Sequence, residues 1–291
     1  MKKISVAMIV KNESAMLARC LESVKEADEI IICDTGSTDN TVEIAKKYTD
    51  KVYTDFVWCD SFEKARNHAK SKATGDYILS IDADEYCHDF SKVREAAEMG
   101  CRALNVRMIA ENSNPETHFY FPRFFANIPE VSWCGDIHNT LNVGPDRDSD
   151  IKITYGFSPA HALDPDRALR VLEKVVKDQG DNAVRELYYL GREYWYKQQY
   201  EKAAATLGRY VQVAYWPREK ADAFLLMSRC YSTLGLDDDA RDACAQAIII
   251  NPNFKEAVLF MGAISIDKNA KQWYRMAETA DNTDILFQRV N

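Results

Sequence analysis

The chain has 291 residues, of which 46% are hydrophobic, and its formal net charge is −8 at pH 7. This length and composition argue against a disordered chain and allow two domains of ordinary size. The negative charge disfavours a protein that binds nucleic acid across its whole surface.

The eight cysteines contain no C-x-x-C pair, and several of them lie in apolar runs. We therefore expect reduced core cysteines and no disulfide framework. No long apolar stretch follows Met1-Lys2-Lys3, so neither a signal peptide nor a transmembrane helix is expected. These features predict a cytoplasmic protein with no membrane insertion.

Short apolar runs alternate with amphipathic segments over the first half of the chain. Buried strands are predicted at residues 4–10, 29–34, 52–53 and 77–81, and helices at 42–48 and 62–72. This β-α alternation predicts a parallel sheet with helices on both faces. Ligands of such sheets bind beyond the carboxyl ends of the strands.

Polar clusters follow three of these strands, at Lys11–Glu13, Asp34–Asp39 and Asp82–Glu85. The chain has no G-x-G-x-x-G and no G-x-x-x-x-G-K-[ST], which excludes the dinucleotide fingerprint and the P-loop. A nucleotide would instead be held by carboxylates on its ribose or base and by a metal on its diphosphate. Asp34 is placed for a ribose or base contact, and its alternative role is to cap the turn that follows it.

The segment Asp82-Ala83-Asp84 comes directly after the strand predicted at 77–81. If these residues stay extended, the carboxylates of Asp82 and Asp84 point to the same side. Two such charges repel unless a cation lies between them, and a hard divalent cation that also binds phosphate oxygens meets that need. The alternative is a solvated acidic turn.

Four motifs occur in order: Met-Ile-Val-Lys-Asn-Glu at 8–13, Asp-Thr-Gly-Ser-Thr-Asp-Asn-Thr at 34–41, Ala-Arg-Asn at 65–67 and Asp-Ala-Asp-Glu at 82–85. Together they resemble a family 2 glycosyltransferase of the GT-A fold. The closer likeness is to the branch with a C-terminal helical-repeat domain, which includes the sublancin-type peptide S-glycosyltransferases. The resemblance implies a nucleotide-sugar donor, expected to be UDP-linked, a divalent Mn²⁺ or Mg²⁺ ion, and a transfer that inverts the anomeric carbon.

By the same resemblance, residues from all four motifs would contact the nucleotide sugar. They are Val10, Lys11, Glu13, Asp34, Arg66, Asp82 and Ala83. The metal ion would be held by Asp82 and Asp84. Enzymes of this fold often return a histidine to complete the metal shell, and His161 is the candidate here. Its alternative is a loop or capping histidine ahead of the next helix.

Two further strands are predicted at residues 103–109 and 118–125, and the second is rich in aromatic residues. Its aromatic side chains are expected in the core, and the alternative is that one or two of them line a sugar or acceptor groove; they are Phe119, Tyr120, Phe121, Phe124 and Phe125. Arg123 within this strand is expected to pair with a phosphate or with a nearby acid.

The stretch 130–139 is expected to supply the base that an inverting transfer needs near the acceptor. It resembles a W-x-G-x-I-H-E pattern in which Asn139 replaces the final acid. Asp136 is therefore the first candidate for the base and Glu130 the second, and His138 is expected to take part.

Helical periodicity replaces the strand pattern from residue 165 onwards. Ala223 and Ala257 lie 34 residues apart, which is the tetratricopeptide period. We therefore predict an α/β GT-A domain at 1–162 and an all-α tetratricopeptide-like domain at 163–291. Such repeats can bind a peptide or form a homodimer.

The sequence thus predicts a metal-dependent glycosyltransferase. Its acceptor is left open between a peptide or protein, a glycan and a modified nucleic-acid base. A nucleotidyltransferase is an alternative, because it also uses paired carboxylates and a metal. The other alternative is an adaptor that binds a partner through its repeats and carries a vestigial nucleotide-binding domain.

Overall fold

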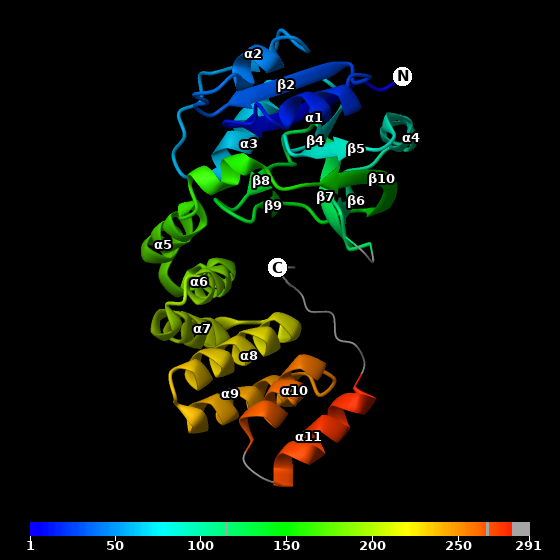
Figure 1. Cartoon of the computed structure of the whole chain (residues 1–291). Coiled ribbons are helices and arrows are strands. Elements are labelled where there is room, and N and C mark those ends of the chain that lie inside the picture. Colours follow the sequence, from blue (N-terminus) through cyan, green and yellow to red (C-terminus); the bar gives the residue numbers. More distant parts are fainter. Residues whose placement is uncertain (114–115, 266–267, 281–291) are drawn as a thin grey trace. The chain divides into compact units, whose positions relative to one another are not determined.

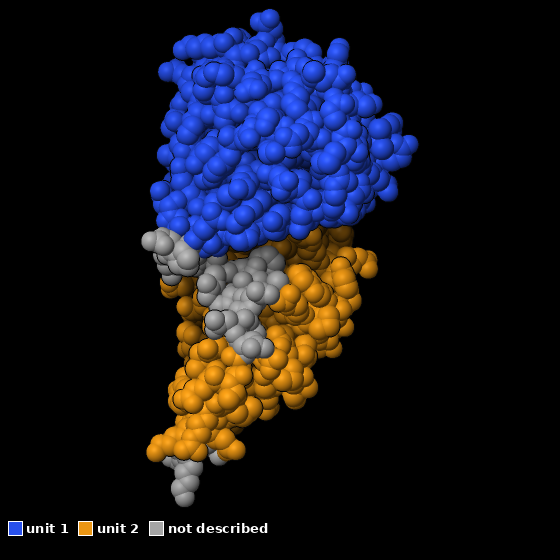
Figure 2. All heavy atoms as spheres, turned by 90° about the vertical axis from the view of Figure 1, so that its right-hand side faces the viewer, with its two compact units in different colours: residues 1–167 blue, residues 168–291 orange. Residues whose placement is uncertain are grey.

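The computed structural model describes residues 1–113, 116–265 and 268–280 (Figure 1). The chain divides into two compact units, Met1–Arg167 and Ala168–Asn291, which Figure 2 shows in blue and orange. The division predicted after residue 162 falls inside a 3-10 helix of the first unit, η1 (Pro159–Leu163). No helix within the described ranges is both long enough and apolar enough to cross a membrane.

An eight-stranded sheet forms the centre of the first unit, in the order β3-β2-β1-β4-β7-β6-β10-β5. The strands are β1 (Ile4–Val10), β2 (Glu29–Asp34), β3 (Val52–Tyr53), β4 (Tyr77–Ser80), β5 (Glu85–Cys87), β6 (Ala103–Ala110), β7 (His118–Ala126) and β10 (Arg147–Tyr155). A separate hairpin contains β8 (Trp133–Cys134) and β9 (Thr140–Leu141). The first two strands begin and end at the predicted residues, because each is a continuous apolar run buried on both faces of the sheet.

The sheet is mixed: the four strands predicted for the first half pair in parallel, and the later strands add antiparallel pairs. β1 pairs in parallel with β2 and β4, but β7 runs antiparallel to both β4 and β6. β6 and β7 are joined only by residues 111–117, and a parallel connection would need a longer crossover.

An irregularity interrupts the pairing of β6 with β7. Leu104 is opposite Phe124, whereas the next residue, Asn105, is opposite Pro122. Arg123 is therefore the extra residue of a β-bulge, a feature that often redirects a side chain near a functional site.

Helices cover both faces of the sheet (Figure 1). On one face lie α1 (Leu17–Ser23), α2 (Thr41–Ala45) and α4 (Phe90–Met99), whose apolar residues share a buried cluster with the strands. On the other face, α3 (Phe62–Ser71) and the β8–β9 hairpin pack over a second cluster. Each fully buried large aliphatic side chain in these clusters contributes about 2 kcal/mol. The parallel strands thereby keep their carboxyl ends at one edge of the sheet.

The second unit is all helical in its described part, which confirms the predicted fold class. Its helices follow α5 (Arg167–Gln179) and a short 3-10 helix, η2 (Gly180–Asn182): α6 (Val184–Tyr196), α7 (Tyr200–Val213), α8 (Pro217–Thr233), α9 (Asp237–Ile250), α10 (Lys255–Ile264) and α11 (Lys268–Thr279). Consecutive helices pack in pairs, as expected for tetratricopeptide-like repeats. Gly191 in α6 allows close packing, because a Cβ atom there would lie 2.5 Å from Leu207 Cγ of α7.

Candidate functional site

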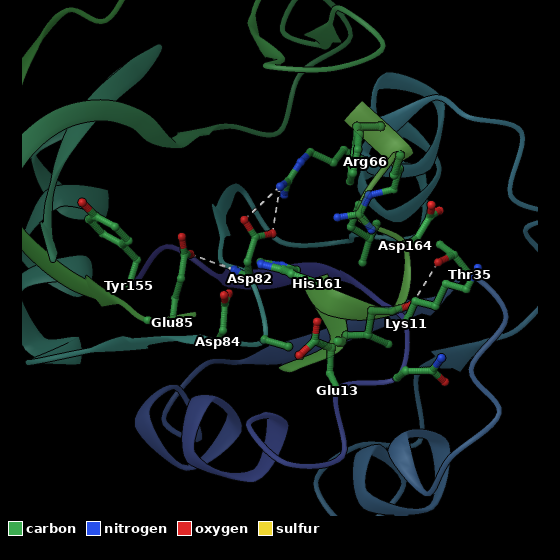
Figure 3. A pocket seen from close by; sticks show the side chains of 18 of the residues that line it. Lys11, Glu13, Thr35, Arg66, Asp82, Asp84, Glu85, Tyr155, His161 and Asp164 are labelled. Atoms are coloured by element: carbon green, nitrogen blue, oxygen red, sulfur yellow. Dashed lines mark hydrogen bonds and ion pairs between the residues drawn. The ribbon is translucent and has the colours of Figure 1, made fainter. Parts of the chain in front are cut away.

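A cavity of about 390 Å³ opens at the carboxyl ends of β1 and β4 (Figure 3). Its wall includes eight residues that the motifs predicted: Val10, Lys11, Glu13, Arg66, Asp82, Ala83, Asp84 and His161. The structure therefore brings the polar clusters after the first and fourth strands into one pocket. From the polar cluster that follows the second strand, Thr35 lines the pocket.

The loop after β1 is held in place by the segment that follows β2. The Asn12 N–H donates to Ser37 Oγ at 2.9 Å, and the Glu13 N–H donates to Thr41 Oγ1 at 2.7 Å. In return, Asn12 Oδ1 accepts from the Thr38 N–H at 2.7 Å. These contacts explain why two motifs separated in sequence form one wall of the pocket.

Asp34 does not line the pocket. It is 4% exposed, and its carboxylate accepts from the N–H groups of Gly36 and Ser37, each at 3.0 Å. This is the turn-capping role that the sequence left as the alternative, and a nucleoside contact by Asp34 stays a prediction. The neighbouring residue, Thr35, reaches the pocket and donates its hydroxyl to the carbonyl oxygen of Val10 at 3.1 Å.

Asp82–Glu85 form a tight turn, so the condition that Asp82 to Asp84 stay extended is not met. The Glu85 N–H donates to the Asp82 carbonyl at 3.0 Å, and Glu85 Oε2 accepts from the Asp82 N–H at 2.8 Å. Both aspartates still face the same pocket, beside the ring of His161 (Figure 3).

The carboxylate of Asp82 is paired with two arginines. Arg66 Nη2 lies 2.8 and 3.0 Å from its two oxygens, and Arg123 Nη2 lies 2.9 Å from one of them. Arg123 also donates to Glu85 Oε1 at 3.0 Å. Burial opposes ionisation of Asp82, but the two guanidinium groups outweigh it and hold the pKa of Asp82 below its usual range. Of the two kinds of partner expected for Arg123, the structure shows the nearby acid, since Arg123 contacts Asp82 and Glu85.

Asp84 has a different electrostatic environment. Burial and the charge of Asp82 raise its pKa, while His161 acts in the opposite direction. Within the described part of the chain, no lysine or arginine forms an ion pair with the Asp84 carboxylate. Asp84 is therefore a partly desolvated acid that lacks a positive partner other than the histidine.

Glu13 is the third acid of this group. Burial raises the pKa of Glu13 to about 7, the hydrogen bond from Ser158 lowers it, and the charges of Asp84 and Asp82 raise it. The Ser158 hydroxyl also accepts from the Ala160 N–H at 3.1 Å and caps η1, which carries His161. One serine thus connects the loop after β1 to the helix that presents the histidine.

The chemistry of these side chains fits a divalent cation. Carboxylate oxygens and an imidazole nitrogen are suitable ligands for Mn²⁺, and Asp84 and His161 supply both kinds. Across residues 1–113, 116–265 and 268–280, however, no three acidic, histidine or cysteine side chains are already arranged to hold a metal ion. The oxygens of Asp82, one of the three predicted metal ligands, are in contact with Arg66 and Arg123. The metal set Asp82, Asp84 and His161 stays a prediction.

The residues predicted to act as or near the base lie outside the pocket wall. Asp136 accepts from the Ser61 hydroxyl and, through its carbonyl, from the Phe62 N–H at 2.9 Å, so it lies at the start of α3. Phe62 itself lines the pocket. Glu130 is exposed, and His138 is an exposed residue with a φ of 47°. The role of Asp136 as base therefore stays a prediction for a residue next to the pocket.

Aromatic residues form two walls that the motifs did not predict. Trp58 and Phe62 meet edge to face with ring centroids 5.0 Å apart, and Phe119 and Tyr155 lie 5.5 Å apart. Only Phe119 carried a signal, because it lies in the aromatic-rich strand. Trp58 and Tyr155 belong to no motif, and their positions depend on where a loop and the last strand of the sheet meet the pocket.

Comparison with known proteins finds similarity in the first unit. Residues 5–131 match the sequence model of the family described as glycosyl transferase family 2. A TPR repeat-containing protein of Synechococcus elongatus is 51% identical over 148 residues, which cover 49% of this chain and 36% of that protein. The glycosyltransferase SunS of the SPbeta prophage in Bacillus subtilis is 42% identical over 83 residues, which cover 28% of this chain and 20% of SunS.

The chain thus spans about a third or less of the length of the curated relatives that it matches. Among solved structures, S. aureus TarS aligns with a TM-score of 0.46 and 17% identity over 83% of this chain and 54% of that chain. The sequence match covers the four motifs that carried the predicted resemblance, and that resemblance is confirmed. The match to the glycosyl transferase family 2 model lies within the first unit, over residues 5–131.

Proposed function

We propose that the chain is a metal-dependent glycosyltransferase that transfers a sugar from a nucleotide-sugar donor to an acceptor nucleophile with inversion. One observation carries this proposal: in a family 2 domain, the acidic turn Asp82–Glu85 and the loop Lys11–Glu13 share one pocket at the carboxyl ends of parallel strands. Such an edge is where ligands of open α/β sheets bind. The expected donor is UDP-linked, as the motifs imply.

The pocket lining contains both apolar and charged side chains, as a nucleoside diphosphate requires. Ile9 and Val10 offer apolar surface beside the hydroxyl of Thr35, which suits a base and a ribose. Lys11 and Arg167 supply positive charge, and Arg167 lies over the ring of Phe62 at 5.1 Å. We assign the apolar end to the nucleoside and the charged residues to its phosphates.

Asp84 and His161, together with Asp82, are the residues that would hold Mn²⁺ or Mg²⁺. When bound, such an ion neutralises charge on the leaving nucleoside diphosphate. The chain itself contributes the positive charges of Arg66 and Arg123 at the same place. These preorganised charges favour departure of an anionic leaving group.

The acceptor must approach from the side of the pocket that the nucleotide leaves open. We assign that side to the aromatic wall of Phe119 and Tyr155, and Asp136 remains the first candidate for the base. The candidate acceptors are peptides or proteins, glycans and modified nucleic-acid bases. A homodimer through the repeat unit remains a prediction, which light scattering tests directly.

The decisive experiment screens nucleotide sugars with Mn²⁺ for slow hydrolysis in the absence of an acceptor. The expected result is release of UDP from one donor, its loss in Asp84→Asn, and its retention in Glu95→Gln. Glu95 is a suitable control because it pairs with Lys92 on the exposed face of α4.

The same assay distinguishes the alternatives. A nucleotidyltransferase would release pyrophosphate instead of a nucleoside diphosphate. An adaptor with a vestigial domain would hydrolyse no donor and would show no heat of UDP binding with Mn²⁺ by calorimetry. Either result would reject the proposed function.

A further inference from the structure

Two arginines occupy the carboxylate at which the predicted cation would bind. Arg66 and Arg123 make three N–H···O contacts with Asp82, between 2.8 and 3.0 Å. Both arginine side chains are 10% exposed, whereas the Asp82 side chain is 27% exposed toward the pocket. A cation that ligates Asp82 must therefore compete with two guanidinium groups that are already in contact.

The charge of Asp82 is already compensated without any ligand. Two guanidinium groups contact its one carboxylate, and Arg123 also pairs with Glu85. The Asp82 carboxylate therefore offers a cation little net attraction while both arginines stay in place. An added diphosphate would neutralise the arginines and leave the charge of Asp82 available to the cation.

Hydrogen bonding within the cluster is incomplete. Arg66 Nε and both Nε and Nη1 of Arg123 are buried and have no hydrogen-bond partner among the described residues. Unpaired buried donors of this kind are costly, and more so in a charged group. A change of partner that satisfies them is therefore favoured when acceptor oxygens become available.

Each arginine also has an anchor that it can keep. Arg66 Nη1 donates to Ser80 Oγ at 3.3 Å, and Arg123 donates to Glu85 at 3.0 Å. The guanidinium of Arg66 lies 5.1 Å from the ring of Trp133. Ser80 and Trp133 retain Arg66 while its Nη2 turns away from Asp82. Arg123 contacts Asp82 and Glu85 through the same Nη2, so it exchanges only the contact with Asp82 and keeps the one with Glu85.

We propose that Asp82 exchanges partners when the donor binds. Without a nucleotide, Arg66 and Arg123 hold Asp82; with one, the two arginines turn to phosphate oxygens and release Asp82 for the divalent cation. This inference rests on the proposed function. It requires the cation and the nucleoside diphosphate to bind cooperatively, and each must raise the affinity for the other by the same factor.

The test measures Mn²⁺ binding by electron paramagnetic resonance and UDP binding by calorimetry, without turnover. Wild-type protein should bind Mn²⁺ at least about tenfold more tightly with UDP than without it. Because UDP itself chelates Mn²⁺, the decisive comparison is Arg66→Gln, which retains a donor for Ser80. This variant should bind Mn²⁺ alone about tenfold more tightly than wild type and UDP about tenfold more weakly.

Two further variants complete the design. Arg123→Gln should likewise bind Mn²⁺ alone more tightly and UDP more weakly than wild type. If this variant does not fold, because Glu85 has lost its partner, the test rests on Arg66→Gln. The matched control is Arg209→Gln, because Arg209 in α7 pairs with the exposed Asp181 and does not line the pocket. Its affinities should equal those of wild type.

The outcomes separate the two proposals. If wild type binds UDP with Mn²⁺ but Arg66→Gln binds Mn²⁺ alone no better than wild type, the exchange is wrong and the proposed function stands. If wild type binds no UDP with Mn²⁺ present, the proposed function fails and the exchange fails with it. A gain in Mn²⁺ affinity together with a loss in UDP affinity supports the exchange, since a merely structural role for Arg66 would lower both.

Discussion

The hydroxyl of Ser158 donates a 2.6 Å hydrogen bond to Glu13 Oε2, although 145 positions separate the two residues in sequence. Ser158 is 1% exposed and begins the helix that carries His161. The bond therefore fixes the two sides of the pocket relative to each other.

Replacing this serine tests that connection. Ser158→Ala should raise the KM for the donor about fivefold to tenfold, because the hydrogen bond that holds the loop after β1 to η1 is lost. Ser91→Ala in α4 is the matched control, since its hydroxyl is remote from the pocket. The measurement is donor hydrolysis against donor concentration, and equal KM values for the two variants would contradict the prediction.

The two aspartates of the acidic turn should differ in their effect on stability. Asp82→Asn leaves Arg66 and Arg123 without a full counter-charge and should lower the free energy of unfolding by about 3 kcal/mol. Asp84→Asn removes a carboxylate whose ionisation is disfavoured by burial and by Asp82, so it should be neutral or stabilise by up to about 1 kcal/mol. Urea denaturation at pH 7 measures both, and equal losses would refute the electrostatic assignment.

A buried cluster at Glu29 should make the first unit sensitive to acid. Burial would raise the pKa of Glu29, but hydrogen bonds from Lys51, Ser5 and Thr74 outweigh it and lower the pKa to about 2. Since the ordinary value is 4.5, the ionised form stabilises the fold above that pH. This stability is lost as the pH falls from about 5 toward 2.

The expected loss at Glu29 is about 2 kcal/mol, once the partial exposure of Lys51 is allowed for. Glu29→Gln should unfold more readily at pH 7 and show a flatter dependence of stability on pH between 5 and 2. Urea denaturation over this pH range compares the variant with wild type. Parallel curves for the two proteins would show that Glu29 does not carry the acid sensitivity.

The helix pair of α6 and α7 offers a matched test of packing. Gly191→Ala would place a Cβ 2.5 Å from Leu207 Cγ, and we expect a loss of about 1–3 kcal/mol from overpacking. At Gly208 in α7 the nearest atom, Met227 Cε, would lie 3.9 Å away. Gly208→Ala should therefore stabilise the helix, by up to about 1 kcal/mol. Calorimetric melting compares the two variants, and a shift in the same direction would overturn the packing argument.

Much of the first unit is predictable from local sequence. The strands at Ile4–Val10 and Glu29–Asp34 are unbroken apolar runs, so their ends are marked by the polar clusters that follow. The hydrogen bonds of Asp34 were predictable as an alternative, because aspartate before a glycine turn commonly caps its own backbone.

Long-range pairing accounts for what the sequence did not reveal. Arg66 comes from α3 and Arg123 from β7, and only the antiparallel pairing of β4 with β7 brings Arg123 to the acidic turn. The turn at Asp82 is held by the hydrogen bond from the Asp82 N–H to the Glu85 carboxylate. The apolar pattern that predicts the preceding strand contains no signal for this bond. The pairing of Asp136 with Ser61 likewise depends on two distant loops.

The β-bulge in β7 determines the direction of the Arg123 side chain. As the extra residue of the bulge between β6 and β7, it is released from the strict alternation that orients its neighbours. Deleting one residue from this part of β7 would give a more regular ladder and take away a counter-charge of Asp82. A regular ladder at this position is therefore incompatible with the ion pair between Arg123 and Asp82.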